Sequence, residues 1–497
     1  MPKLAGVYTF AVNLAEHLPR LGYELRLVGV GPQAKADYAR SLSLLPAEIL
    51  APEARDFESQ RDALVDWLRR ESIDIVMISG SETEHRLVPA LPPSVRVVSV
   101  VNNATRGHYR VATYGHERMH RVVCVSPRLQ RDIIRWCGVP AEKVELIPYG
   151  IDVEAYARAG EKETQPAAFS VGEGGVQRAM AQRFCRPYGA WGSTPATTQG
   201  SRPGLLSVAP AGLGAQSGPY GLSVAATGLG AQSGPYGLSV AATGLGPQSG
   251  PYGLSVAATG LGAQSGPYGL RLVYLGRMFD APKGIFLIPK ILKRLDRAGV
   301  SFHLTVIGDG PDVGRFAARM AAAGLAARWT HRGAMRYDAV PAELARHDVQ
   351  LLPSRHEGLP LTLLEGMAAG CVPVASRLSG ITDYAIATSE QGFLCRVGRA
   401  ADFASAICEL AADRARLRRM SAAAADRVRR EFTSERMAQR YARLFDAILA
   451  EPRSAAWSAR SRRPGVAEAC LASFRRALPA PVKNAVRATC ERMGWTV

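Results

Sequence analysis

A 16-residue repeat interrupts this chain of 497 residues and divides it into two blocks that must bury their apolar surface separately. The unit GLSVAATGLGAQSGPY occurs three times from Gly221 to Tyr268, once with Pro247 in place of Ala, and a degenerate copy precedes it. Each unit has four glycines and one short apolar stretch, so it has little surface to bury and much backbone entropy to lose. We expect an irregular insert without chemistry of its own; a small β-like stack and a partner-binding tract are the alternatives.

The composition around the repeat sets the limits of this insert. No Asp, Glu, Lys or Arg occurs in the 68 residues from Pro203 to Leu270, and the preceding stretch is rich in Gly, Ala, Thr and Gln without regular periodicity. Each flanking block is long enough for one domain. We predict four segments, which are a first domain at 1–164, a low-complexity insertion at the interdomain linker at 165–269, a second domain at 270–450 and a basic tail at 451–497.

Short β-rich runs alternate with helical patterns in both blocks. This alternation predicts parallel sheets that are covered by helices on two faces. The fold class is therefore α/β, with two doubly wound domains. The expected strands are 24–30, 74–79, 95–101 and 121–125 in the first block, and 271–275, 303–307, 349–352 and 372–375 in the second.

The charge, the cysteine spacing and the lengths of the apolar runs indicate where the protein resides and whether it binds a metal. The chain has 61 Lys and Arg against 43 Asp and Glu, a net charge of +18, but 53 of the basic residues are Arg, as a GC-rich coding sequence produces by itself. The eight cysteines show no CxxC motif and no zinc spacing with His, so we expect reduced thiols and no metal. The N-terminus lacks a signal-peptide pattern, and no run of eighteen apolar residues occurs. We expect a cytoplasmic protein.

The tail at 451–497 carries nine Arg and Lys against three Glu. Two short basic helices are expected within 467–495, and they either lie on an anionic membrane surface, such as the inner face of the plasma membrane, or pack on the protein itself. No aromatic and basic stacking platform accompanies the charge, so specific nucleic-acid binding is not expected.

The most informative stretch is 348–384. A buried strand leads into a loop with Glu357 and Gly358, and a helix is expected to start near Pro360. A helix N-terminus behind the carboxyl end of a parallel strand offers backbone N–H groups to a phosphate. Carboxylates there would repel a diphosphate, so the expected partners of Glu357 and Glu365 are the neutral hydroxyls of a sugar and a ribose. The pattern predicts a nucleotide-sugar site.

In this stretch the sequence resembles the retaining glycosyltransferases of family four, also called glycosyl transferases group 1. Their hallmark is two glutamates separated by seven residues, which Glu357 and Glu365 match. The resemblance implies the GT-B fold, in which two Rossmann-like domains face a central cleft. Further matching segments are LIPYGID at 146–152, YLGR at 274–277, KG at 283–284 and IGDGP at 307–311.

The resemblance also implies roles for single residues. Arg277 and Lys283 are expected at the donor diphosphate, where two cations would stabilise a leaving nucleoside diphosphate without a metal. Together with Glu357, which is implied at the donor sugar, they form the expected catalytic set. The other implied donor contacts are Glu365 at the ribose, the amides of Gly358 and Leu359 at phosphate, and Arg332 and Gly333 near the base.

The first block departs from the family pattern. Family members open with a strand before a glycine-rich loop, whereas this chain begins near the end of that loop, so we expect the first, central strand to be missing. A start codon set too far downstream or a damaged gene would explain this. The acceptor-side candidates are Gly6, Asn102, Asn103 and His108. Where many relatives have a histidine, this chain has Asn102 and Asn103, and an amide cannot serve as a base; His108 is the nearest imidazole.

The expected function is the transfer of a sugar, with retention, from a nucleotide-sugar to an acceptor hydroxyl, without a cofactor. The acceptor would be a carbohydrate or a lipid-linked sugar in cell-surface polysaccharide or glycolipid synthesis. The alternatives are a non-catalytic nucleotide-sugar-binding remnant, a nucleotide-sugar epimerase, and a charge-driven membrane or nucleic-acid scaffold that would need neither glutamate.

Overall fold

The computed structural model describes residues 6–30, 47–79, 87–164, 204–208 and 269–451. The repeat units at 221–268 and the predicted tail helices within 467–495 lie outside the described residues, and the predictions made for them stay predictions.

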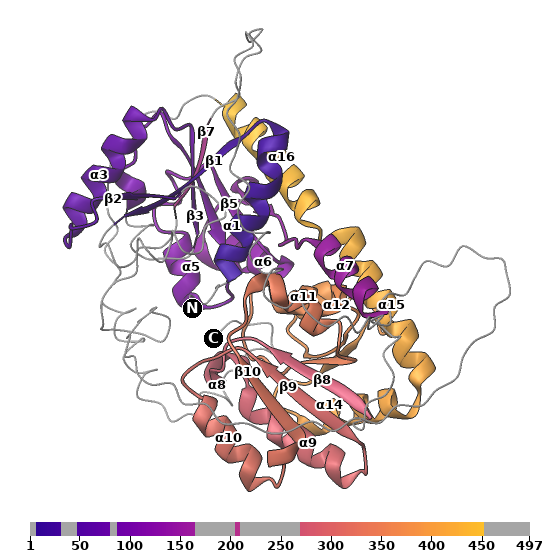
Figure 1. The fold of residues 1–497 in the computed structure, drawn as a ribbon. Coiled ribbons are helices and arrows are strands. Elements are labelled where there is room, and N and C mark those ends of the chain that lie inside the picture. Colours follow the sequence, from indigo (N-terminus) through magenta and orange to yellow (C-terminus); the bar gives the residue numbers. More distant parts are fainter. Residues whose placement is uncertain (1–5, 31–46, 80–86, 165–203, 209–268, 452–497) are drawn as a thin grey trace, which may run out of the picture.

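The first domain is built on a sheet of seven parallel strands in the order β2-β1-β7-β3-β4-β5-β6 (Figure 1). Strands β3 and β4 are buried at every residue, as expected for central strands of a parallel sheet covered on both faces. The seven strands are β1 (Glu24–Val30), β2 (Ala47–Leu50), β3 (Ile75–Ser79), β4 (Arg96–Val101), β5 (Arg121–Cys124), β6 (Val144–Leu146) and β7 (Gly204–Val208).

Helices connect these strands and cover the sheet. The carboxylate of Asp56 accepts a hydrogen bond from the Ser59 amide at the start of α3, and the Thr105 hydroxyl accepts one from the His108 amide at the start of α5. Such caps satisfy N–H groups that have no partner within the helix. The helices are α1 (Gly6–His17), α3 (Phe57–Arg70), α5 (Arg106–Ala112), α6 (Pro127–Cys137) and α7 (Val153–Thr164), with short 3-10 helices at 18–21, 88–90 and 141–143.

Strand β7 corrects two expectations from the sequence. It pairs in parallel with β1 on one side and with β3 on the other, so the centre of the sheet is occupied where a missing strand was expected. It also lies within 165–269, so that stretch is not wholly an insert outside the two domains. The charge-free sequence around the repeat was interpreted as low complexity, although five of its residues suit the centre of a sheet. The domain limits otherwise remain a prediction.

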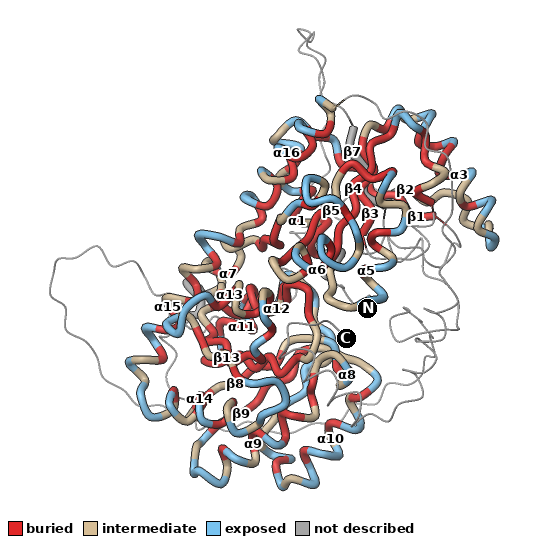
Figure 2. Tube along the Cα trace, turned by 180° about the vertical axis from the view of Figure 1, so that it is seen from behind, coloured by how far each residue is buried: buried red, intermediate tan, exposed pale blue. Residues whose placement is uncertain are grey.

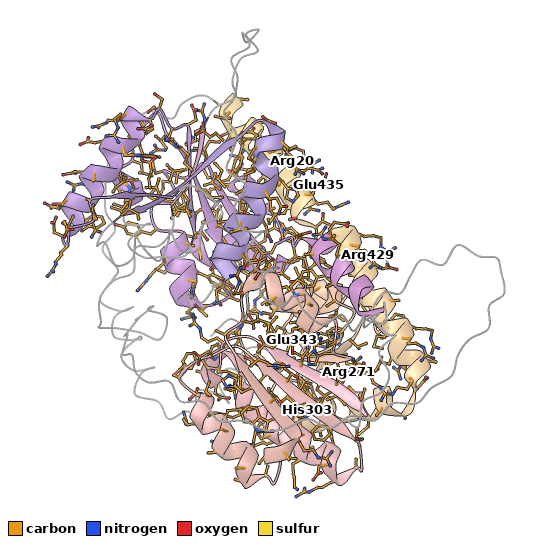
Figure 3. The ribbon with its side chains drawn as sticks, viewed as in Figure 1. Arg20, Arg271, His303, Glu343, Arg429 and Glu435 are labelled. Carbon is orange, nitrogen blue, oxygen red and sulfur yellow. The ribbon has the colours of Figure 1, made fainter. Side chains whose placement is uncertain are left out.

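The second domain has a sheet of six parallel strands in the order β10-β9-β8-β11-β12-β13 (Figure 1). At its centre the Arg271 guanidinium, labelled in Figure 3, donates to Asp348 at 2.8 Å and so ties the start of β8 to the residue before β11. The strands are β8 (Leu270–Leu275), β9 (Phe302–Ile307), β10 (Trp329–Gly333), β11 (Val349–Leu352), β12 (Val372–Ser376) and β13 (Phe393–Cys395).

Eight α-helices in the described part of the chain surround this second sheet. They are α8 (Asp280–Lys283), α9 (Ile288–Arg297), α10 (Val313–Ala322), α11 (Val340–Leu344), α12 (Leu361–Ala368), α13 (Thr382–Ala385), α14 (Ala400–Ala412) and α15 (Arg414–Glu431), with 3-10 helices at 285–287, 326–328 and 337–339. None of the helices in the described part of the chain is long and apolar enough to cross a membrane.

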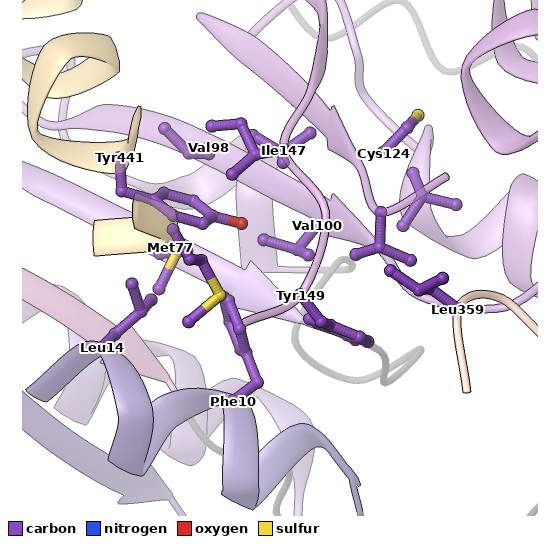
Figure 4. Packing of buried hydrophobic residues seen from close by; sticks show 14 of the residues in the cluster. Phe10, Leu14, Met77, Val98, Val100, Cys124, Ile147, Tyr149, Leu359 and Tyr441 are labelled. Atoms are coloured by element: carbon purple, nitrogen blue, oxygen red, sulfur yellow. The ribbon is translucent and has the colours of Figure 1, made fainter. Parts of the chain in front are cut away.

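The last described helix, α16 (Ser434–Ala450), returns to the first domain and packs along α1 (Figure 1). Tyr441 of α16 lies 5.6 Å from Phe10 of α1 between ring centroids, and both belong to the buried cluster shown in Figure 4. The Arg96 guanidinium at the start of β4 donates to the carbonyl oxygens of Ile448 and Leu449. The two ends of the described chain therefore share one core.

The buried residues lie mainly in the strands of the two sheets and on the helices that cover them (Figure 2). The prediction of two doubly wound α/β domains is confirmed, and all eight expected strands are present with ends that differ by at most one residue. Besides β7, the strands that were not expected are the outermost ones, β2, β6, β10 and β13. Outermost strands are short and partly exposed, so they lack the continuous apolar run that reveals an inner strand.

Candidate functional site

The predicted site residues of the second domain gather behind the carboxyl ends of four neighbouring strands. Arg277 follows β8, Gly308 follows β9, Gly333 ends β10, and the loop at 353–358 follows β11. The Gly308 amide donates to the Gly333 carbonyl oxygen at 2.7 Å, and the Gly276 amide donates to Ile307 at 3.0 Å, so these strand ends are joined through their backbones. Ligands of open α/β sheets bind at this edge.

Helix α8 is fixed against the loop that carries Glu357. Gly284 ends α8 with a φ of +62°, and a Cβ atom there would clash with the carbonyl oxygen of Pro353. From the other side, the Arg355 amide donates to the Pro282 carbonyl oxygen at 2.8 Å, and the Arg355 guanidinium donates to the Asp280 carbonyl oxygen. These contacts bring Lys283 within reach of the loop.

Glu357 is buried and accepts two hydrogen bonds at one carboxylate oxygen. Lys283 Nζ lies 2.6 Å from Oε1, and Ser354 Oγ lies 2.7 Å from the same atom. No described group donates to the second oxygen, Oε2. Removing one partner of such a buried ion pair leaves an uncompensated charge, so Lys283 and Glu357 depend on each other.

Arg277 differs from Lys283 in its surroundings. Its carbonyl oxygen accepts a hydrogen bond from the buried Tyr274 hydroxyl at 2.8 Å, which holds the backbone behind β8 in place. The side chain is exposed, and its guanidinium has no hydrogen-bond or ion-pair partner within the described ranges. Of the two cations predicted at the diphosphate, Lys283 is therefore paired, and Arg277 is unpaired within the described residues.

The N-terminus of α12 lies against the first domain. A Cβ atom on Gly358 would clash with the carbonyl oxygen of Asn102, and the Leu359 side chain is buried in the first domain's core (Figure 4). No group in the described part of the chain accepts a hydrogen bond from the amides of Gly358 and Leu359. Pro360 is the N-cap with ψ 109°, so α12 starts at Leu361, one residue later than the sequence predicted.

Glu365 lies in the second turn of α12 and is only 6% exposed. Burial raises the pKa of its carboxyl to about 7. Tyr156 of α7 lies near Glu365. Burial raises the pKa of its phenol, and the negative charge of Glu365 raises that pKa further. The Tyr156 hydroxyl is buried and has no hydrogen-bond partner among the residues described. No motif in the sequence indicates Tyr156, whereas Ser354 lies within the informative stretch at 348–384.

Arg332 and Gly333 lie on β10, next to the loop behind β9. Arg332 Nε is 3.4 Å from Glu343 Oε1, and Glu343 lies on α11, as labelled in Figure 3. The Gly333 carbonyl oxygen binds the Gly308 amide. The structure thus brings the predicted base-side residues to the same sheet edge as the phosphate-side residues.

Of the first-domain candidates, Asn102 and Asn103 lie beside the loop that carries Gly358, and His108 and Gly6 lie at the starts of helices. Asn102 and Asn103 follow β4 and lie beside the Gly358 loop; Asn102 Nδ2 donates to Ser79 Oγ at 3.2 Å, and the Asn103 amide oxygen is buried without a partner among the described residues. His108 Nδ1 lies 2.7 Å from Thr105 Oγ1 within α5, and burial lowers the pKa of its imidazole. Gly6 is the first residue of α1.

Two family models match this chain, one in each domain. The family model "Glycosyl transferases group 1" matches residues 269–427, and the model "Glycosyltransferase Family 4" matches residues 4–155, which together span more than half of the chain.

Curated relatives match shorter stretches of the chain. The chain is 38% identical over 86 residues to a 2-deoxystreptamine glucosyltransferase from Streptomyces kanamyceticus, which covers 17% of this chain and 22% of that protein. It is 29% identical over 155 residues to an N-acetyl-alpha-D-glucosaminyl L-malate synthase from Bacillus anthracis, covering 31% of this chain and 40% of that protein. The chain thus spans less than half the length of these relatives.

Solved structures match nearly the whole chain in shape. A glycosyltransferase from Rickettsia africae has a TM-score of 0.57 at 13% identity, and covers 91% of this chain and 98% of its own. The Anabaena protein HepE, solved with UDP and glucose, has a TM-score of 0.58 at 14% identity, and covers 90% and 97%. At such low identity the likeness shows the fold.

Proposed function

Since this chain belongs to the GT-B glycosyltransferases that the group 1 and family 4 models describe, we propose that it transfers a sugar from a nucleotide-sugar to an acceptor hydroxyl. The observation that carries the proposal is the arrangement around Glu357. Three kinds of group lie at the edge of one sheet. They are the buried carboxylate of Glu357, of which one oxygen has no described partner, the cations Arg277 and Lys283, and the two amides of Gly358 and Leu359, which have no described acceptor. This set matches a sugar joined to a diphosphate.

The diphosphate is proposed to bind between Arg277, Lys283 and the amides of Gly358 and Leu359. Amides at a helix N-terminus and fixed cations stabilise negative charge without reorganising during the reaction. Arg277 has no partner in the described structure, so its charge is available to the ligand. HepE, which shares the fold, was solved with UDP, and this supports a nucleoside diphosphate as the leaving group.

The two glutamates are proposed to bind hydroxyls. Oε1 of Glu357 is held by Lys283 and Ser354, which leaves Oε2 to accept a hydrogen bond from the transferred sugar. Glu365, in the second turn of α12, would accept hydrogen bonds from the ribose. Its burial makes the carboxylate costly unless hydroxyl donors replace the lost water.

We propose that the reaction retains the anomeric configuration. The bond from the sugar C1 to the phosphate oxygen breaks, the acceptor oxygen bonds to C1 on the same face, and the acceptor proton passes to the leaving phosphate oxygen. Asn102 and Asn103 support this route, because they lie beside the site and amides cannot take that proton. Metal independence is part of the proposal, and an enzyme treated with EDTA should keep its full rate.

The proposed acceptor is a carbohydrate or a lipid-linked sugar, used in cell-surface polysaccharide or glycolipid synthesis by a cytoplasmic enzyme that contacts the membrane. Three large apolar side chains at the ends of α5 and α6 are exposed, with exposed fractions of 47% for Tyr114, 37% for Ile134 and 48% for Trp136. Arg135 lies 5.0 Å from the Trp136 ring, and Arg131 is exposed one turn earlier. Apolar and basic side chains together favour an anionic lipid surface.

The decisive experiment incubates the purified protein with a panel of labelled nucleotide-sugars and a membrane extract. Transfer of label to the extract supports the enzyme. Binding of nucleotide-sugars without transfer or hydrolysis would instead favour a non-catalytic remnant, and conversion of the donor without acceptor would favour an epimerase. Co-sedimentation with anionic and with neutral vesicles tests the membrane contact; equal recovery with both would contradict it.

A further inference from the structure

The central strand of the first sheet comes from a part of the chain that is distant from its neighbours. Residues 204–208 pair with 24–28 of β1 and, from Leu205 on, with 75–78 of β3. Both pairings are parallel. Four of the five β7 residues therefore have a backbone partner on each side, although 173 residues lie between the end of β1 and the start of β7.

Strands β1 and β3 do not pair with each other; each presents a backbone edge to β7. The side chains of β3 are buried at all five positions, so this edge lies in the interior of the domain. A buried N–H or C=O group without a partner destabilises the fold, because it has lost its hydrogen bonds to water. Several such groups would be left unpaired on β1 and β3 if nothing occupied the space between them.

We propose that the first sheet contains a strand-accepting slot between β1 and β3, and that the start of the repeat tract fills it as an internal complementing strand. The occupant is held by backbone hydrogen bonds, as in other cases where an extended segment adds to a sheet. Residues 204–208 are then required for the fold of the first domain.

The sequence of the tract fits such an occupant. The segment GLLSV has no charged residue, which is typical of a strand in the middle of a parallel sheet. The triplet Leu-Ser-Val at 206–208 recurs at 222–224, 238–240 and 254–256. The chain thus contains an internal control, because identical triplets have nearly the same intrinsic rate of amide exchange.

Hydrogen exchange of the full, unmodified chain tests the proposal. The amides of 206–208 should exchange at least ~100-fold more slowly than those of the three later triplets, because exchange requires the sheet to open. Peptides from the later triplets share one sequence and can be measured as a pool, whereas Leu205-Leu206-Ser207-Val208 is unique. Equally fast exchange in all copies would overturn the proposal.

A matched pair of proline variants gives a second measurement. Leu206→Pro removes an N–H group and restrains φ in β7, whereas Leu222→Pro makes the same change in the following repeat. We expect Leu206→Pro to melt several degrees lower or to be recovered in the insoluble fraction, and Leu222→Pro to behave like the parent protein. Equal melting temperatures for the two variants would contradict a structural role of β7. Neither readout depends on transferase activity.

Discussion

One oxygen of Glu357 accepts hydrogen bonds from both Lys283 and Ser354, and the carboxylate is buried. Glu357→Gln keeps the shape of the side chain but removes the charge that pairs with Lys283. We expect kcat/KM to fall by about 100-fold or more, as when a preorganised polar contact is removed from an active site. Glu409→Gln, which alters an exposed pair with Arg416 on α14 and α15, is the matched control. Glu357→Gln with activity close to that of the control would remove Glu357 from the site.

The stability of the protein should depend on pH through Glu365. Burial raises the pKa of this carboxyl from 4.5 to about 7, so the folded protein binds more protons than the unfolded chain between these values. Its contribution to stability is fully present below about pH 4.5 and is lost as the pH rises through 7. The variant Glu365→Gln should therefore melt like the parent at pH 5 and above it at pH 8. An equal difference at both pH values would contradict this.

Nucleotide binding should release a proton at the same residue. If the ribose hydroxyls donate to Glu365, they favour its ionised form and lower the pKa of the carboxyl. We expect the affinity for a nucleotide-sugar, whose diphosphate does not titrate in this range, to increase from pH 6 to pH 8 in the parent and to stay level in Glu365→Gln. Calorimetry at pH 7 in two buffers of different ionisation enthalpy measures the proton; identical heats in both buffers would refute the release.

The charged residues predicted for the site come from short sequence motifs, and their assignment to the site stays a prediction. Arg277, Lys283, Glu357 and Glu365 belong to short motifs, and the structure gathers their segments at one sheet edge. Tyr156 could not be found in this way, because its place beside Glu365 depends on how α7 packs on α12. Contacts between distant segments leave no spacing in the sequence.

At the scale of elements, the loop between β11 and α12 lies directly against the backbone that follows β4. Gly358→Ala would drive a Cβ atom into the carbonyl oxygen of Asn102 and displace the loop that carries Glu357. We expect at least a 10-fold loss of kcat/KM, since small displacements at a reacting centre are costly. Gly314→Ala in α10 is the control, because a Cβ atom there contacts nothing and alanine favours the helix.

The strands show which elements a sequence reveals. Inner strands such as β4 and β11 are buried at every residue and are recognised from their apolar runs. Strand β10 is exposed at its three middle residues and has no such run. Strand β7 was hidden for a different reason: its five residues resemble the repeat that follows them, and their partners lie far away in the sequence.

At the scale of the whole molecule, the last described helix helps to stabilise the first domain. Tyr441 of α16 is fully buried against Phe10 and Phe445. Tyr441→Ala should lower the free energy of unfolding by about 3–5 kcal/mol, the usual cost of removing a large buried ring. Denaturant titration with hydrogen exchange in β3 and β4 measures the loss. The exposed neighbour Arg443→Ala is the control, and an equal effect of both changes would contradict a shared core.

The position of β7 along the chain also affects how the protein is made. A ribosome adds about 5–20 residues per second, so Val208 follows the end of β1 after roughly 10–40 seconds of synthesis. During that interval β1 and β3 have been made, but the strand that joins them has not. The nascent first domain therefore exposes two unpaired strand edges for much longer than a domain whose central strand is translated first. We expect its yield in cells to depend on translation speed and on chaperones that bind nascent chains.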